Sequence, residues 1–294
     1  MNSALAALRE HINAALDQHL PEHSDIAQPV VDAMRHSVLG GGKRLRPMLV
    51  CASCDAVGGK IQDALPAACA LEFIHAYSLI HDDLPAMDDD DIRHGLPSAH
   101  VVYGEANAIL AGDSLHSLAF QTIANSVDES PANKLKKIEL LANAAGWAGM
   151  AGGQCLDIAA EGQSLSLSEL QVLHSAKTGA LIRVAVQIGT LTPTQTPVSK
   201  EQYLLLTEFG DRLGLAFQVM DDVLDVTQST TVLGKPAGSD EALNKNTFPK
   251  LMGIEQAREM AHSLVNEARL LLGRTRLKTD LLEQLATMVV NREY

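Results

Sequence analysis

Aromatic residues, cysteines and long apolar runs are scarce in this sequence. Phe, Trp and Tyr make up only 3% of its 294 residues, although 46% are hydrophobic, mainly alanine and leucine, which favours closely packed helices. The one Cys-x-x-Cys pair, Cys51 and Cys54, has neither a second pair nor a ligand histidine near it. We therefore expect buried thiols, at Cys69 and Cys155 as well, and a reducing, cytoplasmic setting.

No segment is apolar enough to cross a bilayer. The longest uncharged run, residues 140–156, is shorter than the roughly 20 residues that a membrane helix needs, and glycines interrupt it. The N-terminus has no basic segment followed by an apolar one, so we expect no signal peptide. Lys and Arg total 23 against 36 acidic residues, and the net charge of −13 argues against a nucleic-acid partner.

Helical periodicity runs from end to end, and no stretch alternates in the manner of a strand. The sequence therefore predicts an all-α fold, and without a clear linker we expect a single domain over residues 1–294. Pro66 is expected in the first turn of its helix, and Ser166 with Glu169 has capping-box spacing. The expected helices cover residues 4–16, 30–37, about 48 onward, 66–81, 104–120, 134–158, 166–188, 215–225, 254–272 and 279–291.

Aspartates crowd the end of one apolar helix. Six carboxylates fall within residues 82–91, directly after a segment apolar enough to be buried. Such a charge density requires a counter-charge, and a divalent metal ion is the obvious one. Pro85 disfavours helix at the residue before it, so we expect the chain to leave the helix after Asp83 and return Asp88 by a loop.

A second acidic segment repeats this feature. In residues 215–225 the only polar side chains are Gln218, Asp221, Asp222 and Asp225, spaced i, i+3, i+4 and i+7. This spacing places them on one face of a helix. We infer that the two acidic segments face each other across one pocket and share Mg²⁺ ions, which favour carboxylates together with substrate phosphates.

Cations beside glycines are candidate anion sites. Lys43 and Arg46 follow Gly42 at a predicted helix start, where cations oppose the macrodipole, so we expect them to bind a phosphate group. Lys235 and Lys245 lie in a long segment rich in Thr, Ser, Gly and Asn. This segment is a candidate lid that closes on a polyanion.

Further polar residues interrupt apolar helices. Gln154 and Asp157 are a pair at i, i+3 that we expect to face the same pocket. Gly179, after Lys177 and Thr178, costs about 1 kcal/mol in a helix interior, so we expect a local opening that exposes backbone carbonyls.

Two lone polar residues have less distinct patterns. His75 lies seven residues before Asp82 on the same helix face, where a core position and a ligand contact are equally open. Asp113 could be taken for a third metal ligand, but we expect a structural polar contact there.

Together these motifs resemble the trans-isoprenyl diphosphate synthase family, and within it the bacterial short-chain farnesyl type. The resemblance covers essentially the whole chain and rests on two aspartate motifs, a Gly-Gly-Lys-Arg-Leu-Arg-Pro motif before them and a Lys-Thr-Gly motif between them. It implies antiparallel helices around a deep central cavity, usually in a homodimer. It also implies a prenyltransferase that joins isopentenyl diphosphate head-to-tail to dimethylallyl or geranyl diphosphate, releasing diphosphate and yielding farnesyl diphosphate.

The same resemblance implies roles for individual residues. Three Mg²⁺ ions, which the sequence does not distinguish from Mn²⁺, would be held by Asp82, Asp83, Asp88, Asp221 and Asp225. The allylic diphosphate would contact Arg93, Lys177, Lys235 and Lys245, in a site also lined by Gln154, Asp157 and Gln218. Isopentenyl diphosphate would lie on Gly42, Lys43, Arg46 and His75. The implied catalytic set is Lys177, Thr178, Asp82, Asp88 and Asp221, with dipoles near Lys177 and Thr178 facing the allylic cation.

Two positions bear on specificity. His94 stands where the family has a second arginine that helps to hold isopentenyl diphosphate, and a neutral side chain there would weaken binding. Tyr77, with its neighbour Ser78, resembles the floor that stops growth at fifteen carbons, about 7 to 8 Å along the helix axis from Asp82. The alternatives are a geranylgeranyl diphosphate synthase and, from another class, a non-catalytic regulatory subunit, against which the intact aspartates argue.

Overall fold

The structure is a computed structural model that describes residues 3–127, 129–194, 197–227 and 245–291. Its N-terminal part contains α1 (Ser3–His19), α2 (Gln28–Leu39), α3 (Leu45–Ala56), α4 (Ile61–Asp82), β1 (Ile92–Arg93), β2 (Leu96–Pro97), α5 (Ala99–Tyr103) and α6 (Glu105–Ala124). The remainder contains α7 (Pro131–Ala145), α8 (Met150–Ala159), α9 (Leu167–His174), the π-helical turn η1 (Ser175–Gly179), α10 (Ala180–Thr190), α11 (Lys200–Thr227), α14 (Phe248–Met252), α15 (Ile254–Thr275) and α16 (Asp280–Val290). The all-α fold expected from the sequence is confirmed.

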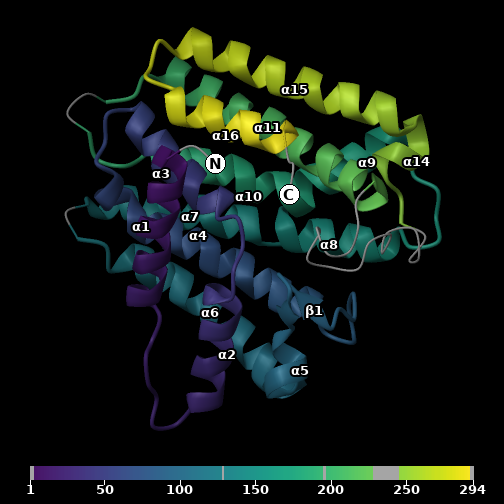
Figure 1. The fold of residues 1–294 in the computed structure, drawn as a ribbon. Coiled ribbons are helices and arrows are strands. Elements are labelled where there is room, and N and C mark those ends of the chain that lie inside the picture. The colour runs from purple at the N-terminus through teal and green to yellow at the C-terminus, as the bar shows by residue number, and fades with distance from the viewer. Residues whose placement is uncertain (1–2, 128, 195–196, 228–244, 292–294) are drawn as a thin grey trace.

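The helices α4 and α10 occupy the interior of this bundle. α10 packs against α3, α4, α7 and α11, while α6 covers another side of α4. The long helices α11 and α15 run side by side, with α16 against both, as Figure 1 shows at the top of the view. The aspartates at the end of α4 and those of α11 therefore reach the same region of the bundle, near α8 and α9.

Apolar residues make up most of the buried surface of the interior helices. In α4 the buried residues include Leu71, Phe73 and Ile74, each 0% exposed, and nearly all of α10 is buried. A helix that is apolar all round belongs in a core. In the part of the chain that the structure describes, no helix is long and apolar enough to cross a membrane.

Two helix expectations are corrected. α4 begins at Ile61, so Pro66 lies inside the helix and not in its first turn, because the residues between them also form helix. The segment 134–158 is two helices, since the chain breaks between Gly146 and Gly149. A Cβ atom on Gly149 would lie 2.2 Å from the Ala144 carbonyl oxygen, so only glycine permits this turn. The capping box at Ser166 is present.

A short hairpin follows the first aspartate motif, where no strand was predicted. β1 and β2 pair antiparallel, and the two turn residues between them, His94 and Gly95, have φ values of +54° and +79°. Positive φ at both positions is the signature of a type I′ turn. The turn fixes Arg93 and His94 next to each other at the end of α4.

Candidate active site

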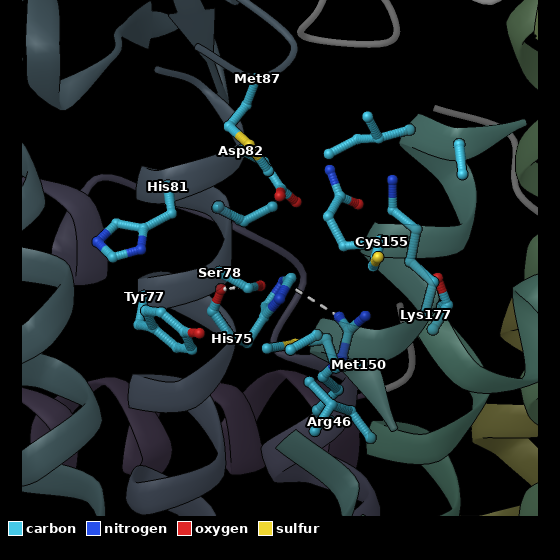
Figure 2. A pocket seen from close by; sticks show the side chains of 17 residues that line it. Arg46, His75, Tyr77, Ser78, His81, Asp82, Met87, Met150, Cys155 and Lys177 are labelled. Atoms are coloured by element: carbon cyan, nitrogen blue, oxygen red, sulfur yellow. Dashed lines mark hydrogen bonds between the residues drawn. The ribbon is translucent and has the colours of Figure 1, made fainter. Parts of the chain in front are cut away.

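Two adjoining cavities lie between α4, α8, α11 and η1. The larger measures about 560 Å³ and the smaller about 200 Å³. Leu79, Asp82, Lys177 and Thr178 line both, so the two spaces meet at these residues. Figure 2 shows the larger cavity, with the Asp82 and Lys177 side chains toward its upper end and Arg46 beside His75 below.

One face of α4 forms the first wall. His75, Ser78 and Asp82 follow the spacing i, i+3 and i+7, and all three line the larger cavity. The helix ends at Asp82, and the backbone N–H of Asp88 donates to the Asp82 carbonyl at 2.8 Å. The chain therefore folds back over the end of α4, as the sequence predicts.

A widened helical turn forms the opposite wall. The π-helix η1 confirms the opening expected around Lys177, Thr178 and Gly179. α8 approaches it so closely that a Cβ atom on Gly153 would lie 2.2 Å from the Lys177 backbone nitrogen. This approach brings Asp157 of α8 to the lysine, with 2.5 Å between Lys177 Nζ and Asp157 Oδ2.

Both aspartate segments contribute to the smaller cavity. Its charged lining consists of Asp82, Asp88, Asp90, Arg93, Asp157, Lys177, Asp221, Asp222 and Lys245. The first acidic segment and the second therefore face one space, as inferred from the sequence. The lysines come from η1 and from the segment just before α14.

The acids in this cavity repel one another. Burial, together with repulsion from Asp88 that Lys177 partly offsets, raises the pKa of Asp82 to about 6. Burial disfavours the charged form of Asp157 too, but attraction to Lys177 outweighs it and lowers the pKa of Asp157. Asp88 Oδ1 is 3.3 Å from Lys245 Nζ. The two lysines thus neutralise two of the acids and leave Asp82 in need of a cation.

The donor set suits Mg²⁺. In the described ranges, no three His, Cys, Asp or Glu side chains stand close enough to hold a metal ion by themselves. Mg²⁺ is commonly bound through one or two carboxylates plus ligand phosphates, without an all-protein cage. Carboxylates from both segments border this cavity, and the raised pKa of Asp82 shows that a nearby cation would stabilise its ionised form.

Two predicted metal ligands do not line either cavity. Asp83 is 3% exposed, and its Oδ1 accepts a hydrogen bond from Arg93 Nε at 2.9 Å. Asp225 is 2% exposed. Arg93 also donates to Asp90 at 3.1 Å. The structure therefore places Asp83 where it fixes Arg93 beside the smaller cavity.

The basic motif meets the hairpin near the larger cavity. Arg46 and His75 line that cavity, with Arg46 Nη1 and His75 Nε2 3.1 Å apart. A Cβ atom on Gly42 would lie 3.5 Å from His94 Nε2, so the glycine loop touches the hairpin. Burial, followed by the cations of nearby arginines and Lys43, lowers the pKa of His94 to about 4. The imidazole is therefore neutral at pH 7.

Arg44 anchors this loop, a role that the sequence does not indicate. It is 6% exposed with φ +56°. Its guanidinium donates to Glu72 Oε1 at 2.7 Å, Asn13 Oδ1 at 2.9 Å and the Val38 carbonyl at 2.6 Å. These bonds tie the loop to α1, α2 and α4 and fix the flanking cations.

Polar side chains connect the walls. Thr178 Oγ1 donates to Gln218 Oε1 at 3.0 Å, which joins η1 to α11. Gln154 lines the larger cavity, and its buried amide atoms have no hydrogen-bond partner among the described residues. A buried polar group without a partner in a cavity wall indicates a ligand or water.

Aromatic rings are packed behind Tyr77 in the α4 wall. Its ring centroid lies 5.0 Å from that of His81 and 5.2 Å from that of His116, which in turn lies 5.2 Å from Phe120. The rings meet edge to face, an arrangement that aromatic pairs prefer. Tyr77 and Ser78 line the larger cavity. The space beside the Tyr77 ring is filled by other rings and is not open.

Lys235, the cysteines and Asp113 were also singled out in the sequence. Lys235 lies outside the described residues. All four cysteines are free, and three are buried, but Cys155 is exposed because its side of α8 lines the larger cavity. Asp113 is absent from the lining of both cavities; its side chain is 63% exposed, with His81 Nε2 3.9 Å from its Oδ1, so the structural polar contact expected there stays a prediction.

Several lining residues were not predicted. Asp90, His174, Asn246 and Thr247 are among them and line the smaller cavity, whereas Asp222, which also lines it, was expected on the helix face toward the pocket. Asp90 stands inside the first acidic segment and carried a signal, but a lone histidine in an apolar segment did not. The apolar lining of the larger cavity, which includes Met87, Met150, Ile158 and Leu181, is indistinguishable from core in the sequence.

A family model described as polyprenyl synthetase matches residues 27–287. This chain belongs to the polyprenyl synthetase family. It is 46% identical to the farnesyl diphosphate synthase of Escherichia coli K12 over 293 residues, covering 98% of this chain and 97% of the relative. It is also 46% identical over 262 residues to the chloroplastic geranylgeranyl pyrophosphate synthase of Capsicum annuum, covering 88% of this chain and 69% of the relative.

A solved structure extends the likeness to three dimensions. The geranyltransferase of Helicobacter pylori, in complex with magnesium and isoprenyl diphosphate, superposes with a TM-score of 0.87 at 32% identity. The match covers 98% of this chain and 96% of the other. The fold and the family are therefore shown along the whole chain.

Proposed function

We propose that this protein is a Mg²⁺-dependent prenyltransferase that condenses isopentenyl diphosphate with dimethylallyl or geranyl diphosphate to farnesyl diphosphate. One observation carries the proposal: both aspartate segments meet Lys177 and Lys245 in one charged cavity, which opens into a larger space with apolar lining. A diphosphate head fits the first and an isoprenoid tail the second. The names of the E. coli and Helicobacter relatives support this assignment.

The charged cavity would hold the allylic diphosphate. Lys177, Lys245 and Arg93 supply fixed positive charge there, and charge grows on the diphosphate as its bond to the allylic carbon breaks. Mg²⁺ held by Asp82, Asp88 and Asp221, in the number of three that the family resemblance implies, would add Lewis-acid stabilisation of that leaving group. Asp83, whose carboxylate accepts from Arg93, would support that arginine and not hold a metal ion itself.

The carbon chemistry would take place where the cavities meet. Lys177 and Thr178 line both spaces, and the Thr178 hydroxyl and η1 backbone offer dipoles to the allylic cation. The double bond of isopentenyl diphosphate, held by Gly42, Lys43, Arg46, His75 and His94, attacks that cation. Loss of a proton to the departed diphosphate ends the cycle, so no protein base is required.

Assembly and location belong to the same proposal. We propose one domain over residues 1–294, a homodimer and a cytoplasmic setting. The family resemblance supports the dimer. The four free thiols are in keeping with a reducing compartment.

A longer product is the second candidate. The Capsicum relative, named a geranylgeranyl pyrophosphate synthase, is as similar as the E. coli one over the aligned part. Tyr77 and the rings behind it favour a closed wall and hence the shorter product. The non-catalytic regulatory subunit is disfavoured, because both aspartate segments line one cavity together with Lys177 and Lys245.

Product analysis tests the function directly. Purified protein is incubated with isopentenyl diphosphate, geranyl diphosphate and Mg²⁺, and products are measured by mass spectrometry. We expect a dominant fifteen-carbon product that disappears with EDTA and returns when Mg²⁺ is added back. A twenty-carbon product would replace the farnesyl assignment, and no product from well-folded protein would refute the enzyme.

Tyr77→Ala should lengthen the product. Removing the ring opens the wall toward His116 and Phe120, so we expect products beyond fifteen carbons with substrate consumption retained. Tyr103→Ala is the matched control, because Tyr103 packs on His36 and does not line the larger cavity. A strictly fifteen-carbon product from Tyr77→Ala would exclude Tyr77 as the floor.

His94→Arg should strengthen binding of isopentenyl diphosphate. The neutral His94 lies against Gly42 and near Lys43, and a permanent charge there gains a bond to phosphate of about 1.5 to 3 kcal/mol. We expect steady-state kinetics to show KM for isopentenyl diphosphate falling roughly tenfold, with KM for geranyl diphosphate unchanged. His262→Arg, which adds the same charge on the exposed side of α15, should change neither value.

An unchanged KM in His94→Arg, with the protein folded and active, would place His94 outside the isopentenyl diphosphate site.

A further inference from the structure

Lys245 is the one described cation of the smaller cavity that comes from neither a helix nor the hairpin. Its side chain is 16% exposed, and its Nζ lies 3.3 Å from Asp88 Oδ1, at the end of α4. The segment 245–247 precedes α14, so no helical hydrogen bonds fix the lysine. Contacts of Asn246 and Phe248 hold the segment that carries it.

Asn246 supplies one anchor. Its Oδ1 accepts a hydrogen bond from the Leu165 N–H at 3.1 Å, and its Nδ2 donates to the Gln163 carbonyl at 2.9 Å. Both partners lie in the loop between α8 and α9. A second anchor is needed to orient the segment over the cavity.

Phe248 supplies the second anchor. Its ring is 0% exposed and lies almost parallel to His174, with centroids 5.5 Å apart and 28° between the planes. Its backbone N–H donates to Asp222 Oδ2 at 3.0 Å. This bond satisfies the first N–H of α14, one of those that a helix cannot pair within itself.

Asp222 joins this anchor to the reaction centre. The carboxylate is 2% exposed, and its other oxygen, Oδ1, accepts from Gln218 Nε2 at 3.0 Å. Gln218 Oε1 in turn accepts from Thr178 Oγ1 at 3.0 Å. A continuous chain of three bonds therefore runs from η1 through α11 to the start of α14.

His174 packs against the same carboxylate. Its Nε2 is 3.8 Å from Asp222 Oδ2, beyond hydrogen-bond distance, and neither ring nitrogen has a hydrogen-bond partner among the described residues. Its fixed contact is therefore the stacking on Phe248. The ring therefore acts as a flat support for Phe248, while its nitrogens lie in the wall of the smaller cavity, open to a ligand or water as the Gln154 amide is.

We propose that Asp222, Phe248 and His174 form a clamp that positions Lys245 over the diphosphate cavity. This rests on the proposed function, because Lys245 is taken to contact the allylic diphosphate there. Asp222 is then a positioning residue within the second aspartate motif, since one of its oxygens accepts a hydrogen bond from Gln218 and the other from the Phe248 N–H. The clamp couples the reacting end at Thr178 to the cation that holds the leaving group.

A double-mutant cycle between Phe248→Ala and Lys245→Ala tests the clamp. Phe248→Ala should raise KM for geranyl diphosphate on the order of tenfold, the effect of displacing one charge-assisted hydrogen bond, with KM for isopentenyl diphosphate unchanged. Lys245→Ala should raise KM for geranyl diphosphate by a similar factor. Because the clamp acts only through Lys245, the double variant should resemble Lys245→Ala alone.

A matched control separates the clamp from general damage. Phe209→Ala removes an equally buried ring from α11 that lines neither cavity, and should lower stability without a selective change in KM. His174→Phe keeps the stacking surface and should leave KM for geranyl diphosphate near the wild-type value, whereas His174→Ala should raise it. Losses in Phe248→Ala and Lys245→Ala that multiply in the double variant would overturn the clamp.

Substitution at Asp222 distinguishes positioning from metal binding. In Asp222→Asn the amide still accepts from Phe248, and Gln218 and Thr178 reverse their donor and acceptor roles to keep the chain intact. We expect this variant to retain its Mg²⁺ requirement and most of its affinity for geranyl diphosphate, while Asp222→Ala loses that affinity. A large rise in the Mg²⁺ requirement of Asp222→Asn would contradict the clamp and make Asp222 a metal ligand.

Failure of the clamp is separable from failure of the proposed function. If wild-type protein forms no prenyl product, the function is wrong. If wild type is active and the variants do not follow the pattern above, only the clamp is wrong.

Discussion

Carboxylates that line a partly buried cavity must be neutralised, and this requirement accounts for most of the contacts around the site. Lys177 pairs with Asp157, Lys245 with Asp88 and Arg93 with Asp83. Asp82 has no such hydrogen-bonded cation among the described residues, and its pKa is raised to about 6. A divalent cation bound together with a polyanion would stabilise the ionised form of this carboxylate.

This arrangement of charges is possible because glycines let the helices approach one another closely. Gly153 lets α8 lie on the backbone of Lys177, and a Cβ atom on Gly214 would lie 2.9 Å from the Gly179 Cα atom, so α11 lies equally close to η1. Two helices, α8 and α11, thus converge on one widened turn. With larger residues at these glycines, Asp157, Lys177 and Gln218 would be farther apart, and the two cavities would not share a wall.

Much of the fold and the site could be predicted from the sequence because the signals are local. Periodicity gave the long helices, and spacing placed Asp82, Asp88 and Asp221 on a common pocket. The sequence could not distinguish Asp83, which is turned into the protein, from the aspartates that face the cavity, nor could it show that Asp222 in the cavity wall accepts a hydrogen bond from Phe248. Both outcomes depend on partners, Arg93 and Phe248, that are ten or more residues away. The breaks at Gly146 and Gly149 and the role of His174 likewise depend on tertiary contacts.

The central claim is that the two aspartate segments act on one metal-bound diphosphate. The most direct test is the affinity for inorganic diphosphate, measured by calorimetry at several Mg²⁺ concentrations in wild type, Asp82→Asn, Asp221→Asn and the double variant. The account predicts that diphosphate binding depends on Mg²⁺ and that each substitution weakens it. It also predicts a coupling free energy between the two substitutions well above the roughly 0.5 kcal/mol found for independent sites. Strictly additive losses of binding free energy in the double variant would show that the segments form separate sites. Diphosphate binding that does not depend on Mg²⁺ would equally contradict the account.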